Sequence, residues 1–268
     1  MEAAQAPASA VSTPAEQLHR CEESFGRSAA TERIAGCTAV LQSREADEPT
    51  RLGALVSRAA GYMSASDIPH AIADYSEAIR RDKRNSLLYW MRGMAYVDMK
   101  DFRRAISDYG LAIEYGPTDP VPLVERGKSY LQLGKVSLAL ADFDRAAALG
   151  SSSWGCDERA KLGIELDRAR ADCDAAIQEA KANPFSKEYT GPYVWRAMVA
   201  MKQKRFQDAW IDCDSAVRVK PDSYGFFGRG LAALALGRTN EGKADIAKAL
   251  QLDPKIAEYY AAHGLAHE

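Results

Sequence analysis

The segment from Ser86 to Asp119 carries the clearest pattern of apolar and polar positions in the chain. Its apolar and small residues fall into two helical patterns, separated by a polar break at Lys100 and Asp101. The same pattern returns thirty-four residues earlier and thirty-four residues later. The sequence between Leu52 and Ser153 therefore predicts three tandem copies of a pair of antiparallel helices.

Small and aromatic residues recur at fixed positions of this thirty-four-residue unit. In the central copy, positions 8, 11, 20, 24, 27 and 32 are Gly93, Tyr96, Ala105, Tyr109, Ala112 and Pro117. This pattern resembles the tetratricopeptide repeat. Small residues at positions 8 and 20 let two helices approach closely, and neighbouring pairs must stack to bury their apolar faces. The resemblance implies an all-α, right-handed solenoid of antiparallel helix pairs.

The repeat register divides the chain into about six units. Three regular units are followed by a fourth, which has a short first helix from about Trp154 to Leu162, and by two further regular units. Ile256 to about Gly264 is expected to form a C-terminal capping helix. We expect residues 1–14, rich in Ala, Pro and Ser, to be a disordered leader, residues 15–50 a divergent helix pair with its connection, and residues 51–268 the solenoid.

Composition and charge exclude two classes of partner. The formal net charge is -2 and the isoelectric point about 6.2, with both signs interspersed. Because no block of Lys and Arg supplies a basic surface, nucleic acid is not expected as a partner. No apolar run approaches the roughly 18 residues of a membrane-spanning helix.

Residues 1–14 resemble the start of an exported bacterial protein after cleavage. This resemblance favours the periplasm or secretion, with the cytoplasm as the alternative.

Two charged residues recur with the repeat. Position 7 is arginine in five units, at Arg58, Arg92, Arg126, Arg196 and Arg229. Position 23 is aspartate in all six, at Asp74, Asp108, Asp142, Asp172, Asp212 and Asp245. An anion-binding row and a structural row of ion pairs both fit this pattern. We favour the structural row, because the pattern recurs with every repeat whereas a catalytic group occurs once per site.

Four of the five cysteines form two pairs of nearly equal spacing. Cys21 and Cys37 fall at positions 8 and 24 of a unit, and Cys156 and Cys173 fall at positions 7 and 24. We predict a disulfide in each pair, with buried, unlinked thiols as the alternative. The spacing does not suit a zinc site. Cys213 has no cysteine counterpart, because Arg196 occupies position 7 of its unit, and it is expected to be a small core residue.

The sequence contains no pattern that points to an enzyme. His263 and His267 are four residues apart near the terminus and lack a third ligand. The stretch from Gly225 to Gly230 has the glycines of a phosphate loop in the wrong order. We therefore expect no catalytic residue, no metal and no cofactor.

The resemblance directs attention to the concave surface, which such repeats line with positions 2, 5, 9, 12 and 13. The groove is predicted to contain Val56, Ala60, Met63, Trp90, Met94, Val97, Asp98, Val124, Lys128, Leu131, Met198 and Met201. The row is apolar and rich in methionine, which suits an adaptable binding surface, although neighbouring repeats can also cover these side chains. The basic residues of a carboxylate clamp are missing. We predict a scaffold that binds an apolar peptide or amphipathic helix, with a self-associating assembly module of the cell envelope as the alternative.

Overall fold

The computed structural model describes residue 21 and residues 27–183 and 188–265. Within these residues the chain forms fourteen helices and no strand. The expected leader and the first helix of the divergent pair lie outside the described residues. The chain divides into two compact units, Met1–Val136 and Ser137–Glu268, which we call unit 1 and unit 2.

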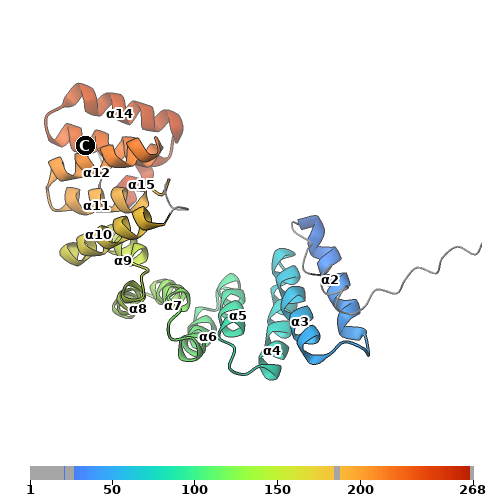
Figure 1. Ribbon diagram of the computed structural model, residues 1–268. Coiled ribbons are helices and arrows are strands. Elements are labelled where there is room, and N and C mark those ends of the chain that lie inside the picture. The colour runs from blue at the N-terminus through green and yellow to red at the C-terminus, as the bar shows by residue number, and fades with distance from the viewer. Residues whose placement is uncertain (1–20, 22–26, 184–187, 266–268) are drawn as a thin grey trace, which may run out of the picture. The chain divides into compact units, whose positions relative to one another are not determined.

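Unit 1 is a series of helices in which each packs against the next (Figure 1). Its helices are α2 (Arg27–Gln42), α3 (Glu48–Ser64), α4 (Ile68–Arg81), α5 (Ser86–Asp98), α6 (Phe102–Tyr115) and α7 (Val121–Gln132). The pairs α3–α4 and α5–α6 are the first two regular repeats. The turn after each first helix places a residue with positive φ, Ser66 and Lys100, between the helices.

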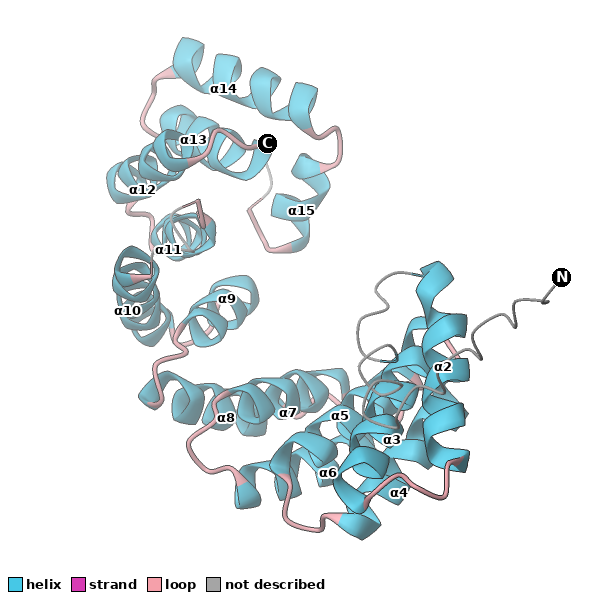
Figure 2. Cartoon of the chain, turned by 45° about the vertical axis from the view of Figure 1, so that its right-hand side comes forward, coloured by secondary structure: helices cyan, strands magenta, loops and turns pink. Residues whose placement is uncertain are grey.

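Unit 2 continues the alternation of first and second helices (Figure 2). Its helices are α8 (Val136–Ala148), α9 (Ser153–Leu162), α10 (Leu166–Ala182), α11 (Gly191–Lys202), α12 (Phe206–Val219), α13 (Ser223–Ala235), α14 (Thr239–Leu252) and α15 (Ile256–Ala262). The first helices also contact one another, α9 against α11 and α11 against α13. As predicted, α9 is short, with 10 residues, and α15 packs on α13 and α14 as a terminal cap.

Glycine at the predicted contact positions permits the close approach of paired helices. A Cβ atom built on Gly93 would lie 2.6 Å from the ring of Tyr109 on α6. In the last repeat both contact positions are glycine, and a Cβ on Gly230 would lie 2.9 Å from the carbonyl oxygen of Gly242. A larger residue would force these helices apart, because real Cβ atoms do not approach so closely.

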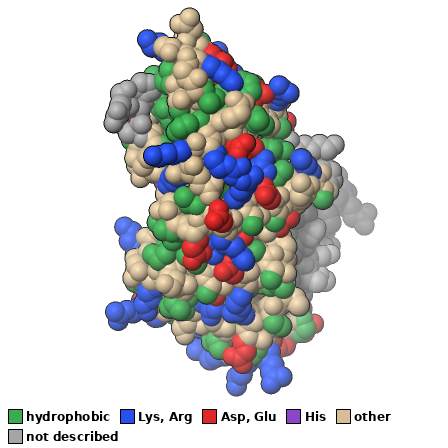
Figure 3. All heavy atoms as spheres, turned by 90° about the vertical axis from the view of Figure 1, so that its left-hand side faces the viewer, with side chains coloured by type: hydrophobic (Ala, Val, Ile, Leu, Met, Phe, Trp, Pro, Cys, Tyr) green, Lys and Arg blue, Asp and Glu red, His purple; other side chains and the backbone are tan. Residues whose placement is uncertain are grey.

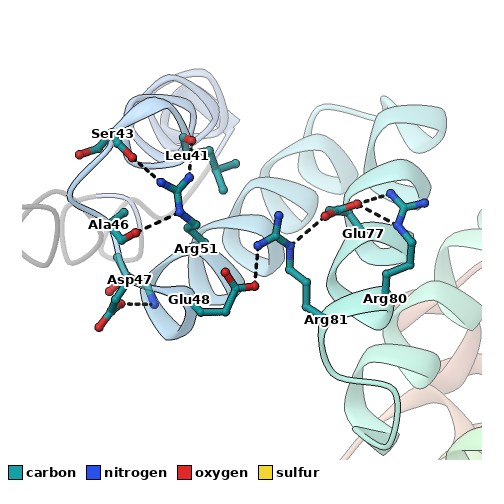
Figure 4. Close-up of polar contacts among 10 residues, drawn as sticks. Leu41, Ser43, Ala46, Asp47, Glu48, Arg51, Glu77, Arg80 and Arg81 are labelled. Carbon is teal, nitrogen blue, oxygen red and sulfur yellow. Dashed lines mark hydrogen bonds and ion pairs between the residues drawn. The ribbon is translucent and has the colours of Figure 1, made fainter.

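Arg51 fixes the connection between α2 and α3 (Figure 4). Its guanidinium donates to the backbone oxygens of Leu41, Ser43 and Ala46 at 2.9, 2.6 and 3.0 Å. Asp47 accepts a hydrogen bond from the Thr50 backbone at 2.9 Å and thus caps α3. Because of this cap, α3 begins at Glu48, inside a segment that the sequence predicted to be a connection.

The opposite ends of the first repeat are linked by an ion-pair network, which Figure 4 also shows. Arg81 at the end of α4 contacts Glu48 at the start of α3 at 2.6 Å, and Glu77 on its own helix at 2.9 Å. Arg80 also binds Glu77. Each of these side chains is at least 30% exposed, so we expect the network to stabilise the repeat by less than about 1 kcal/mol per pair.

Candidate interaction surfaces

The apolar groove residues predicted on α3 and α5 are half-buried or exposed in unit 1, and we call this set the stripe. Trp90 packs against the core cluster around Leu55 and Leu88, and also against the cluster of Tyr96 and Tyr109. Its indole Nε1 is buried and has no hydrogen-bond partner in the described chain. Trp90 therefore serves as a core residue as well as a wall of the stripe.

The stripe reaches the solvent through the side chains around Trp90. Met94, one turn further along α5, is 39% exposed, and Val97 is half-buried. Val56, Ala60 and Met63 on α3 are also half-buried. Asp98 is exposed and follows Val97 at the end of α5.

Helix α7 contributes unequally to the predicted groove. Val124 is 4% exposed and belongs to the interior. Lys128 and Leu131 are half-buried, and the Lys128 ammonium contacts Glu125 at 2.8 Å. The apolar part of α7 that remains accessible is thus centred on Leu131.

In unit 2 the predicted groove residues lie in the core. Met198 is fully buried and Met201 is 6% exposed. Both belong to one cluster with Ile256 and Tyr260 of α15. The capping helix thus supplies apolar partners for positions that could otherwise face a ligand.

The predicted Arg–Asp rows form ion pairs inside the repeats. In unit 1, Arg92 donates two hydrogen bonds to Asp108, both at 2.8 Å, and Arg58 binds Asp74 with the same geometry. The third nitrogen, Nη1 of Arg92, donates to the hydroxyl of Ser76 at 3.0 Å. These hydrogen bonds to Asp108 raise the pKa of Arg92. The pairs link the two helices of a repeat, and the third bond reaches the preceding repeat.

In unit 2 the third nitrogen meets a second carboxylate. Arg196 binds Asp212 in the same two-pronged manner and reaches Asp174 at 2.5 Å. Arg229 binds Asp245 and reaches Asp214 at 2.8 Å. These second acceptors occupy position 25 of the preceding repeat, where unit 1 has Thr38, Ser76 and Gly110. The sequence pattern at positions 7 and 23 alone did not indicate them.

The fourth repeat shifts its arginine by one helical turn. Cys156 occupies position 7, and Arg159 supplies the guanidinium instead. The Arg159 side chain is 1% exposed and contacts Asp144, Glu165 and Asp172 at 2.7, 2.9 and 2.7 Å. Gly155 leaves space for this group, because a Cβ there would lie 2.7 Å from Asp172 Oδ2.

The predicted cysteine pairs lie at disulfide distance. The Cα atoms of Cys21 and Cys37 are 5.3 Å apart, and those of Cys156 and Cys173 are 4.8 Å apart. Cys213 is a free cysteine and fully buried, and burial raises the pKa of its thiol. Two such pairs are typical of a protein from an oxidising compartment.

Unit 2 contains a pocket that the sequence did not indicate. Its volume is about 470 Å³, and its lining is contributed by α9, α11, α13, α15 and the loops before α11 and α13. Its aromatic residues are Tyr189, Trp195, Tyr224 and Tyr259. Tyr189 meets Trp195 edge to face with ring centroids 5.9 Å apart, and Tyr224 meets Tyr259 at 5.0 Å. These residues come from four separate segments, so no periodic pattern connects them.

One glycine lies directly against the Trp195 ring, and partial burial affects the tyrosine hydroxyls. A Cβ on Gly191 would lie 2.8 Å from the Trp195 ring, so the indole rests directly against the first turn of α11. Burial raises the pKa of Tyr189 to about 12, and the carboxylate of Asp157 acts in the same direction. Burial also raises the pKa of Tyr259. These hydroxyls are therefore neutral at physiological pH.

Charged side chains are mixed in sign over the face shown in Figure 3, with hydrophobic side chains between them. In the described residues, no group of three His, Cys, Asp or Glu side chains is arranged to hold a metal ion. None of the described helices combines the length and apolarity needed to cross a membrane.

Comparison with known proteins supports the repeat assignment. The tetratricopeptide repeat family model matches residues 87–119 and 225–256, one segment in each unit. No curated protein sequence matches the chain.

Several solved structures share the fold. A tetratricopeptide repeat protein from Parabacteroides merdae superposes with a TM-score of 0.60 at 17% identity, over 94% of this chain and 98% of that one. The type IV pilus biogenesis factor PilW gives 0.59 at 19% identity, over 76% and 94%. YrrB, described as having an unusual peptide-binding site, gives 0.51 at 18%, over 76% and 97%. The repeat residues, the helix pairs and the two matched segments agree, and the chain has the fold of tetratricopeptide-repeat proteins.

Proposed function

We propose that this protein is a non-enzymatic interaction scaffold that binds an apolar peptide or amphipathic helix on unit 1. The observation that carries the proposal is the stripe of half-exposed apolar side chains on α3 and α5, with Met94 at its most open point. Repeat proteins of this fold commonly serve as interaction modules, and the structural neighbour YrrB is described as binding a peptide.

The spacing of the stripe suits a helical or extended partner. Trp90, Met94 and Val97 are four and three residues apart, so their side chains share one face of α5. Each Å² of apolar surface that a partner covers contributes about 25 cal/mol. A partner that covers on the order of 300 Å² gains free energy that can offset the entropy lost when a short peptide becomes ordered. This requires a peptide whose shape is complementary to the stripe. The softness of Met63 and Met94 suits more than one such shape.

We further propose that the protein works in the periplasm or outside the cell. The two cysteine pairs at disulfide distance support this proposal, because structural disulfides persist in oxidising compartments.

The test compares two exposed methionines on either side of the groove boundary. Met94→Asp places a charge in the stripe, while Met99→Asp places it at the end of α5, where Met99 is 45% exposed and outside the predicted groove. Wild-type protein and both variants are used as bait in an envelope extract, and retained proteins are identified by mass spectrometry. A specific partner should be lost from Met94→Asp and retained by Met99→Asp.

Affinity for that purified partner is then measured by calorimetry. We expect Met94→Asp to weaken binding at least about tenfold, because a buried, unpaired carboxylate opposes it. Equal affinities of the two variants would contradict the proposal. Sedimentation of the free protein separates this function from self-association, which would appear as a concentration-dependent increase in mass.

A further inference from the structure

The pocket of unit 2 contains the exposed tyrosine side chains of the described residues. Among the described residues only two aromatic side chains are exposed, Tyr189 at 43% and Tyr224 at 38%. Both line this pocket, together with the more buried rings of Trp195 and Tyr259. The pocket is thus lined by two exposed rings and two half-buried rings. Its volume of about 470 Å³ lies within the usual range of ligand sites, roughly 300–1,000 Å³.

Some charged side chains of the pocket form ion pairs or hydrogen bonds, and others do not. Lys161 is held by Asp157 at 2.7 Å and by Glu158 at 3.7 Å. Asp222 accepts hydrogen bonds from the Gly225 backbone N–H at 2.8 Å and from the Thr190 hydroxyl at 3.1 Å. Glu188 and Lys220, both exposed, make no ion pair within the described chain. The pocket thus contains two carboxylates, of Glu188 and Asp222, and one ammonium without an ion-pair partner in the described chain, that of Lys220.

We propose that this pocket receives an arginine side chain of a partner polypeptide. The negative faces of Tyr and Trp rings attract cations, and a guanidinium can stack on a ring while its N–H groups bind a carboxylate. Glu188 is the expected carboxylate partner, since Asp222 already accepts two hydrogen bonds. The excess of negative charge opposes an acidic ligand, and the aromatic walls give a planar guanidinium more contact than a lysine ammonium.

The position of the pocket allows a partner chain to run across it. The lining is contributed by the first helices α9, α11 and α13 and by the cap α15, so the pocket belongs to the face on which first helices contact one another. This site does not depend on the groove of unit 1. It adds a charge-specific contact to a protein whose proposed groove is apolar.

The experiment is a titration of the full-length protein followed by NMR at the indole N–H of Trp195. The probe is Nα-acetyl-arginine amide, and the matched control is Nα-acetyl-citrulline amide, which has the same shape without the charge. We expect the arginine probe to shift the Trp195 signal in a saturable way and the citrulline probe to bind roughly tenfold more weakly or not at all. The indole signals of Trp90 and Trp210 should not move.

Four variants distinguish an arginine site from other readings. Glu188→Gln and Tyr224→Ala should each weaken the arginine probe by roughly threefold to tenfold. Lys220→Gln should strengthen it, because a competing positive charge is removed. Met99→Ala in unit 1, at an exposed position outside the predicted groove, should leave the affinity unchanged. Equal binding of arginine and citrulline, or the absence of a saturable shift at Trp195, would overturn the proposal. So would tighter binding of arginine by Glu188→Gln together with weaker binding by Lys220→Gln.

Circular dichroism of each variant confirms that it remains folded. Because Glu188 and Tyr224 are exposed, their substitution removes little core packing. Failure of this test would leave the apolar groove of unit 1 unaffected. Loss of partner binding by Met94→Asp with an intact arginine response would in turn assign the two contacts to separate surfaces.

Discussion

The two units use the same arginine position in different electrostatic settings. In unit 1 each described arginine pair joins one guanidinium to one carboxylate, and the third nitrogen of Arg58 or Arg92 meets a hydroxyl. In unit 2 the corresponding arginines each bind two or three carboxylates. The helical framework is the same, so the difference lies in position 25 of the preceding repeat. A single residue per repeat, at position 25, therefore decides whether the third arginine nitrogen meets a neutral hydroxyl or a carboxylate.

The comparison shows how interdependent the charges of unit 2 are. Replacing an arginine that binds one aspartate leaves one buried carboxylate without an ion-pair partner. An arginine that binds several carboxylates leaves all of them close together when it is removed. The penalty for truncation should therefore grow with the number of acidic partners.

The largest effect is expected at Arg159. Arg159→Met keeps an apolar stem but removes the buried cation that contacts Asp144, Glu165 and Asp172. Because this side chain is 1% exposed, we expect a loss of about 3–5 kcal/mol in the free energy of unfolding. Arg92→Met in unit 1 leaves Asp108 alone and should cost about 1–3 kcal/mol. Urea unfolding, with hydrogen exchange followed separately in each unit, measures both.

Arg168→Met is the matched control for this comparison. Arg168 contacts the same Asp144 and Asp172, but its side chain is 53% exposed. Its removal should cost less than about 1 kcal/mol. Equal losses for the Arg159 and Arg92 variants would show that the number of carboxylates does not set the penalty.

The disulfides provide the next test, because each unit contains one cysteine pair. In the chain-entropy model, closing a loop with a sequence separation of 17, as between Cys156 and Cys173, contributes about 3 kcal/mol. The double change of Cys156 and Cys173 to alanine should lower the stability of unit 2 by about that amount and leave unit 1 unchanged. The double change of Cys21 and Cys37 should do the reverse.

Thiol counting checks the oxidation state directly. Denatured, unreduced protein from an oxidising compartment should expose one reactive thiol, that of Cys213, and reduction should raise the count to five. In the folded protein Cys213 should react slowly, because it is fully buried and burial raises its pKa. Five thiols before reduction would contradict the disulfides and favour the cytoplasm.

Much of the fold was predictable because it is periodic. The thirty-four-residue spacing indicated the helix pairs, and the sixteen-residue separation of Arg92 and Asp108 indicated a contact that the structure confirms. The displaced Arg159 escaped notice because it lies one turn away from the repeat position. Its only signal was the cysteine at position 7.

The interaction surfaces were harder to predict, since exposure depends on the neighbouring elements. Met94 and Met198 share position 9, yet Met94 is 39% exposed while Met198 is fully buried. Met198 belongs to the same core cluster as Tyr260 of the terminal helix α15. The aromatic pocket unites Tyr189 and Tyr259 across seventy residues with no repeat relation, so only the fold brings them together.

The smallest expected effect is a change in the relative stability of the two units as the pH falls. In unit 1 hydrogen bonds lower the pKa of Asp47, through Thr50, and of Asp101, through Arg104. A lowered pKa in the folded state contributes stability above the unfolded value, here 3.8, and that stability is lost as the pH falls through the folded value. In unit 2 burial raises the pKa of Asp172 and Asp212, and the nearby carboxylates of Asp144 and Asp174 add to this.

A raised carboxyl pKa has the opposite consequence, because the folded state then binds the proton more tightly than the unfolded state. The penalty of ionising Asp172 and Asp212 is present above their folded pKa values and is relieved as the pH falls through them. Lowering the pH from 6 toward 3 should therefore weaken unit 1 relative to unit 2. Hydrogen exchange, corrected for the intrinsic pH dependence of the exchange rate, measures the two units in one sample. Asp174→Asn and Asp144→Asn should reduce the difference in pH dependence between the units, since they remove the second carboxylates. A ratio of hydrogen-exchange protection between the units that stays constant across this pH range would show that the extra acidic groups do not distinguish them.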